Sequence, residues 1–102
     1  MDLIEFFLPV RDNSGNAIPF AKFQRVKEEL GKEFGGVTAF LSSPGEGMWR
    51  ESPKNFVRDD VVTFEVMTEA INRDWWKAYK KELEERFGQE AIVVRKMQIE
   101  IL

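Results

Sequence analysis

The sequence predicts a single α+β domain in which four strands form one antiparallel sheet and two helices cover one of its faces. Three observations predict it. A chain of 102 residues has room for one hydrophobic core. Some segments carry the two-residue alternation of strands, and others carry the three- and four-residue steps of amphipathic helices. The order of these segments along the chain is strand, helix, strand, strand, helix, strand.

The first strand and the first helix are expected on either side of a polar turn. In residues 3–10 the even-numbered side chains share one face of the strand and the odd-numbered ones share the other. Pro19 suits the first turn of a helix, where a missing N–H group costs little. The pair Gly35-Gly36 is expected to end this helix, because glycine adopts the left-handed C-cap geometry without strain. The stripe at helical spacing consists of Phe20, Phe23, Val26, Lys27, Leu30 and Phe34.

The middle of the chain predicts a long hairpin. Residues 37–43 and 61–68 alternate as strands. Between them, residues 43–47 favour a turn or bulge, residues 48–50 can resume the strand, and residues 51–55 suit a hairpin tip. A loop of this length without internal structure would be unusual in a compact domain. We therefore expect an extended hairpin arm with a bulge.

The second helix and the last strand complete the pattern. Asn72 or Asp74 can cap the helix, and Gly88 is expected to stop it. Residues 91–102 predict a long final strand, in which Arg95 falls on the same face as the apolar residues. Arg95 therefore indicates either a bulge or a polar neighbour at that end. The buried stripe of the helix is expected to contain Trp76, Tyr79, Leu83 and Phe87.

This order of elements is the β-α-β-β-α-β arrangement of ferredoxin-like folds. We predict one ferredoxin-like sandwich over residues 1–102, with an antiparallel four-stranded sheet and two helices on one face. Two helices cover only one face of such a sheet. The other face is therefore expected to be open.

The open face is the most informative prediction for function. Half of its expected residues are apolar, whereas an antiparallel sheet that faces water is usually more polar. Three interpretations stay open: a homodimer stacked sheet on sheet, a small-molecule site on this face, or an error in the assigned strand faces. The expected residues are Glu5, Phe7, Thr38, Phe40, Thr63, Glu65, Met67, Ile92, Val94 and Lys96.

Candidate binding residues lie on this face and on the hairpin. A carboxylate of Glu5 or Glu65 among apolar side chains would have a raised pKa and could act as a base, or it could pair with Lys96. Trp49 could wall a pocket and Arg50 could hold a carboxylate or phosphate. Alternatively, Trp49 packs on a helix end or a partner, with Arg50 in solvent. The candidate ligand-binding residues are Phe7, Phe40, Trp49, Arg50, Glu65 and Met67.

Composition narrows the chemistry. The chain has no cysteine and no histidine, so disulfides, thiol nucleophiles and the commonest metal ligand are absent. We expect no metal and no cofactor. The net charge of −3 argues against nucleic acid as a partner. The first residues do not resemble a signal peptide and no apolar run is long enough for a membrane span, so we expect a cytoplasmic protein with no membrane partner.

With these elements placed, the chain resembles the ferredoxin-like group and, within it, the dimeric α+β barrels. The stretch Phe87-Gly88-Gln89-Glu90, with Arg86 before it and Ala91-Ile92-Val93-Val94 after it, is similar to the ending of an uncharacterised family of small bacterial domains. Gly47-Met48-Trp49-Arg50 and the acid-rich third strand are similar to the middle hairpin of that family, which has no assigned activity.

The resemblance implies two kinds of function. Many dimeric α+β barrels are oxygenases, decarboxylases or isomerases, and many of those use a histidine, which this chain lacks. Others bind amino acids or partners as regulatory modules. Our leading hypothesis is a small homodimeric ligand-binding or regulatory domain that dimerises through the open face. The alternatives are a cofactor-free enzyme that acts on a small hydrophobic acid with a carboxylate base, and a pure interaction protein without a cavity.

Overall fold

The computed structural model describes residues 1–52 and 55–102, with side chains in 1–41 and 60–102. It confirms the predicted ferredoxin-like α+β fold and the order of its elements. Residues 53–54 of the predicted hairpin tip lie outside the described residues. The elements are β1 (Asp2–Pro9), α1 (Phe20–Phe34), β2 (Thr38–Ser52), β3 (Asn55–Thr68), α2 (Arg73–Arg86) and β4 (Val94–Gln98).

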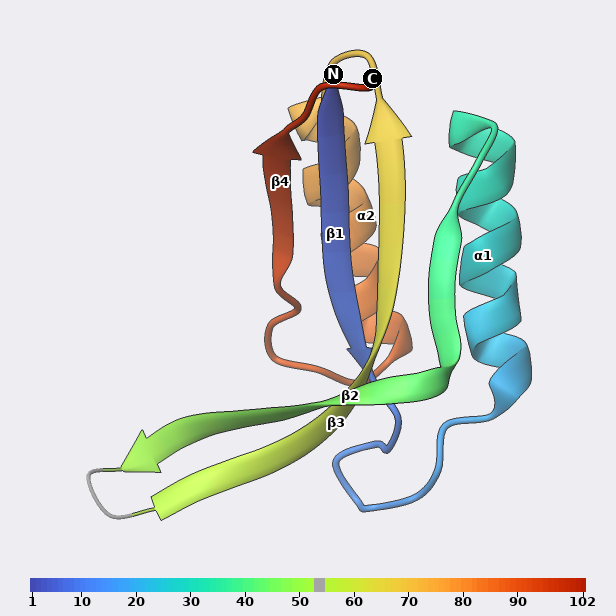
Figure 1. The fold of residues 1–102 in the computed structure, drawn as a ribbon. Coiled ribbons are helices and arrows are strands. Elements are labelled where there is room, and N and C mark those ends of the chain that lie inside the picture. The colour runs from blue at the N-terminus through green and yellow to red at the C-terminus, as the bar shows by residue number, and fades with distance from the viewer. Residues whose placement is uncertain (53–54) are drawn as a thin grey trace.

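The strands form one sheet in the order β2-β3-β1-β4, and every neighbouring pair is antiparallel. Both helices lie on the same side of this sheet, as Figure 1 shows. β1 and β3 occupy the centre, so their inward side chains meet both helices. The opposite face carries no helix, as the sequence predicted, and we call it the open face.

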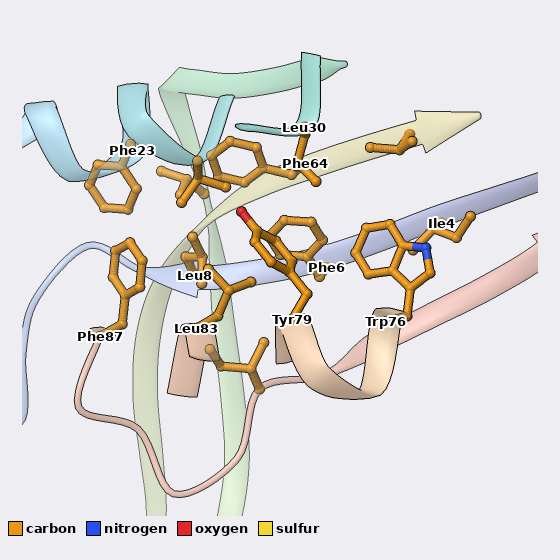
Figure 2. Packing of buried hydrophobic residues seen from close by; sticks show 14 residues of the cluster. Ile4, Phe6, Leu8, Phe23, Leu30, Phe64, Trp76, Tyr79, Leu83 and Phe87 are labelled. Carbon is orange, nitrogen blue, oxygen red and sulfur yellow. The ribbon is translucent and has the colours of Figure 1, made fainter. Parts of the chain in front are cut away.

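The core lies between the sheet and the helices. The rings of Phe6 and Phe64 stack with centroids 5.1 Å apart, and Trp76 packs against Phe6 at 5.9 Å (Figure 2). Alternation in β1 and β3 thus delivers the large apolar side chains to one face, where their burial stabilises the fold. The core residues are Ile4, Phe6, Leu8, Phe23, Val26, Leu30, Val62, Phe64, Val66, Trp76, Tyr79, Leu83, Phe87 and Ile92.

The helix ends follow from local chemistry. Gly35 takes the left-handed conformation with φ of 74°, and its N–H group donates to the carbonyl of Gly31 at 2.9 Å. Asn72 rather than Asp74 caps α2, because its side chain accepts a hydrogen bond from the Trp75 backbone N–H at 3.1 Å. Phe20 is 59% exposed, so its expected place in the buried stripe was wrong.

The hairpin arm is confirmed in the backbone. β1 ends at Pro9, opposite Val61, and one more backbone hydrogen bond runs from the Val10 N–H to the Asp60 carbonyl at 3.1 Å. Beyond Asp60, the described register pairs β2 and β3 with each other. They form a two-stranded ribbon that extends away from the helices (Figure 1). The register shifts between Phe40 and Gly45, where the sequence predicted a turn or bulge.

The last strand is shorter than the predicted range 91–102. At its start, the buried Ile92 donates its backbone N–H to Oε2 of Glu84 at 2.8 Å, which holds this segment against α2. At its end, Gln98 pairs with Asp2, the first residue of β1, and one further backbone hydrogen bond runs from the Ile99 N–H to the Met1 carbonyl at 2.9 Å. The strand itself spans Val94–Gln98.

Candidate functional site on the open face

Strand pairing places four of the predicted site residues together. Phe7 lies opposite Thr63, and Thr63 lies opposite Phe40. Met67 lies opposite Leu3, on the same face. Phe40 and Met67 are 47% and 53% exposed, so two large apolar side chains of this face are open to solvent. Glu65 lies in β3, two residues from Thr63 and two residues from Met67. Because residues two apart in a strand share a face, Glu65 lies on the open face as well.

Three residues that the sequence assigned to this face lie elsewhere. Val94 pairs with Phe6 and Lys96 with Ile4, so both point to the helix side, and Ile92 is buried in the core. The assigned faces of the last strand were therefore reversed. Arg95 and Met97 take the positions on the open face instead, opposite Glu5 and Leu3.

Arg95 was the charged residue that the sequence pattern placed among the apolar residues of the last strand, and the structure shows what it contacts. Its guanidinium pairs with Glu5, with Nε donating to Oε1 at 2.7 Å and Nη2 also in contact. The same group lies 5.1 Å from the centre of the Phe7 ring, in cation–π contact. The expected pairing with Lys96 was wrong, because Lys96 contacts Asp2 at 3.2 Å. The polar neighbour expected for Arg95 is therefore Glu5.

Glu65 faces Glu5 directly across the β1–β3 pair. Burial, together with the nearby Glu5 carboxylate, raises the pKa of Glu65 above its usual value. Arg95 pairs with Glu5 and not with Glu65, and Glu65 has no ion-pair partner within the described residues. Glu65 is thus a carboxylate that can accept a proton or a hydrogen bond from a ligand.

Trp49 and Arg50 belong to the hairpin arm. Their backbones lie in β2, opposite Val57 and Phe56 of β3. Their side chains lie outside the described part of the structure, so their proposed contact with a ligand stays a prediction.

Within the described residues, no three Asp or Glu side chains gather closely enough to hold a metal ion. None of the described helices has the length and apolar character needed to cross a bilayer.

The fold and the open face define a ferredoxin-like α+β domain, and solved structures are similar to it. A phage SAM lyase, solved in complex with S-methyl-5′-thioadenosine, aligns with a TM-score of 0.66 and 16% identity, over 95% of this chain and 80% of the lyase. CutA from Pyrococcus horikoshii aligns with a TM-score of 0.61 and 12% identity, over 100% of this chain and 87% of CutA. No family model and no curated protein matches the chain.

Proposed function

We propose that the protein is a homodimeric domain that pairs through the open face of its sheet and binds a small molecule between the two sheets. One observation carries this proposal. A face that no helix covers presents Phe40 and Met67 beside a charged centre of Glu5, Glu65 and Arg95. Exposed apolar surface with a polar centre is typical of a contact or ligand site.

A second copy of the chain fits this face for two reasons. A twofold interface is self-complementary, so the cationic Arg95 of one copy can meet the partner's Glu65. In addition, the hairpin arm, where β2 and β3 extend past the end of β1, is a ribbon of two strands in the described structure. A two-stranded ribbon alone is marginally stable in water. Contact with a second copy would stabilise it.

The test of the dimer compares two lysine substitutions by light scattering. Phe40→Lys places a charge on the open face, and the expected result is a folded monomer. Phe20→Lys is the matched control, because Phe20 is similarly exposed but lies at the start of α1. It should leave the dimer intact. A wild-type monomer, or equal disruption by both variants, would contradict the proposal.

The chemistry of the face indicates the class of ligand. Phe7, Phe40 and Met67 suit an apolar body, and Glu65 suits an amino group or another hydrogen-bond donor. Trp49 and Arg50 are proposed at the rim. S-methyl-5′-thioadenosine is the first compound to test, because the similar phage lyase is solved with it and its adenine carries an amino group.

Binding is measured as a shift in unfolding temperature. A compound at about 100 times its Kd stabilises a folded protein by about 2.7 kcal/mol. We expect S-methyl-5′-thioadenosine to raise the melting temperature of the wild type and to have a smaller effect on Glu65→Gln. No shift in melting temperature at high concentration would exclude this compound as a ligand. The light-scattering experiment tests the dimer independently of that result.

A second candidate function is cofactor-free catalysis with Glu65 as the base on a small hydrophobic acid. The raised pKa of Glu65 favours it, because a base works best when its pKa lies near the working pH. Glu65→Gln separates the two functions: loss of turnover with binding retained indicates an enzyme. The similarity of Phe87-Gly88-Gln89-Glu90 to small bacterial domains, and a cytoplasmic location, stay predictions.

A further inference from the structure

A groove lies on the helix-covered side of the sheet, between the first half of α2 and β4. This groove has a volume of about 170 Å³, and the buried Ile4 and Trp76 line it. A molecule of liquid water takes up roughly 30 Å³, and pockets for drug-sized ligands start at roughly 300 Å³. The groove therefore suits a group the size of a phosphate.

Five of the nine residues that line the groove are basic. Its basic residues are Arg73, Lys77, Lys80, Arg95 and Lys96, and it has no acidic lining residue. The whole chain carries a net charge of −3, so overall composition does not explain this concentration of positive charge. A cluster of cations in a concave site attracts anions.

Three of these cations already have partners. Lys80 contacts Glu84 at 2.7 Å and Lys96 contacts Asp2 at 3.2 Å, while Arg95 pairs with Glu5. Arg73 and Lys77, in contrast, have no ion pair with any described residue. They lie four positions apart in the first turns of α2, and both line the groove. They are therefore the cations available to a ligand.

Two neutral features add to the attraction for an anion. α2 begins at Arg73, so the positive end of its dipole lies at the groove. Nε1 of Trp76 is buried and has no acceptor among the described groups. Figure 2 shows this nitrogen on the edge of the indole that faces Ile4, another lining residue. The Trp76 nitrogen is buried from water in this conformation. A ligand would therefore reach this nitrogen only after the lysine and arginine side chains that line the groove shift.

We propose that this groove binds a small phosphate-bearing ligand, with Arg73 and Lys77 as its principal contacts. Lysine acts on phosphate as a point charge and arginine as a two-pronged donor, and several separate cations suit a multiply charged anion better than a single carboxylate. The site is distinct from the open face. Arg95 borders both, with its guanidinium held by Glu5.

The test titrates the ¹⁵N-labelled full chain with inorganic phosphate at constant ionic strength, because salt screens exposed charges. We expect saturable shifts in the amide signals of Arg73, Lys77, Arg95 and Lys96. Shifts that do not saturate, or an equal response to acetate, would overturn the proposal.

A double variant assigns the contacts. Arg73→Gln combined with Lys77→Gln is expected to weaken phosphate binding by at least about tenfold, because it removes both unpaired cations. The matched control is Lys27→Gln with Lys32→Gln on α1, which changes the net charge by the same amount at two exposed positions. The control should change affinity by less than about twofold. An equal loss in both double variants would show attraction to net charge alone and would overturn the site. Circular dichroism confirms that each variant is folded.

Discussion

Arg86 of α2 holds Glu29 of α1 through two hydrogen bonds, from Nη1 to Oε1 at 2.6 Å and from Nη2 to Oε2 at 3.1 Å. The Tyr79 hydroxyl donates to the same Oε1 at 3.1 Å, and Arg86 also contacts Glu82 at 2.8 Å. Planar, two-pronged pairing of this kind is the strongest form of arginine–carboxylate contact. One glutamate thus joins the two helices that cover the sheet.

Arg86→Met should lower the free energy of unfolding by about 1–2 kcal/mol, because the partly buried Glu29 then loses its two-pronged partner and keeps only the Tyr79 hydroxyl and the more distant Arg25. Urea unfolding at neutral pH measures it. Arg25→Gln is the control: Arg25 is largely exposed and lies 3.9 Å from Glu29, so its loss should change stability by about 0.5 kcal/mol or less. A larger effect at Arg25 than at Arg86 would contradict this account of the helix contact.

Glu29 should also contribute a pH-dependent part of the stability. The Arg86 hydrogen bonds hold the pKa of Glu29 below its usual value, so the unfolded chain binds the proton more readily than the folded one. This contribution is present above the unfolded pKa of about 4.3 and is lost as the pH falls through the folded pKa.

The comparison of wild type with Glu29→Gln measures that contribution. The wild type should be more stable near neutral pH, and the difference should shrink towards zero in strong acid. Urea unfolding at a series of pH values gives both curves. A difference that stays constant with pH would assign the effect to shape rather than charge.

Glu65 should show the opposite dependence. Its pKa is raised by burial and by the neighbouring Glu5, so the folded protein binds the proton more readily than the unfolded chain. Stability from this group is full below the unfolded pKa of about 4.3 and falls as the pH rises through the folded pKa. Glu65→Gln removes that loss.

The expected result is that Glu65→Gln gains stability relative to the wild type as the pH rises from acid to neutral. Thermal unfolding at low protein concentration measures this in the monomer. Glu69→Gln, at an exposed position just after β3, is the control and should show no comparable gain. Parallel curves for wild type and Glu65→Gln would mean that burial and Glu5 do not raise the pKa of Glu65 in the folded protein.

Gly35 should resist substitution more than its neighbour Gly36. Gly35 has φ of 74°, whereas Gly36 has no positive φ, and both have open space where a Cβ atom would lie. The conformation alone therefore decides the outcome. Gly35→Ala should lower stability by about 1–2 kcal/mol, and Gly36→Ala should be neutral or slightly stabilising. Equal effects in chemical denaturation would refute the conformational explanation.

Much of the fold could be predicted because alternation and helical spacing are local signals. The strand faces of β1 and β3 followed from the alternation around Phe6 and Phe64 alone. Periodicity does not, however, show where a neighbouring element ends. Phe20 fits the helical stripe but is the first residue of α1, and it remains exposed.

The alternation within each strand also predicted most of the candidate site. The prediction missed the residues of β4, because the face of that strand depends on a contact with a distant element. Phe7, Phe40, Glu65 and Met67 follow from their own strands. The face of β4 follows from Ile92 just before the strand, which is buried in the core and whose N–H donates to Glu84 of α2. Arg95 was the one local signal of this error, since a charged residue among apolar ones disagreed with the assigned face.

The contact between Glu84 and Ile92 gives a direct test of that explanation. Oε2 of Glu84 accepts the Ile92 N–H at 2.8 Å and the Lys80 Nζ at 2.7 Å. Glu84→Ala should therefore increase the exchange rate of the Ile92 amide hydrogen by at least about tenfold, because a hydrogen bond to a charged acceptor is stronger than one between neutral groups. Lys80→Ala breaks the ion pair but keeps the Ile92 bond, so this amide should stay protected. If both variants exchange alike, the ion pair and not the backbone contact holds the segment before β4.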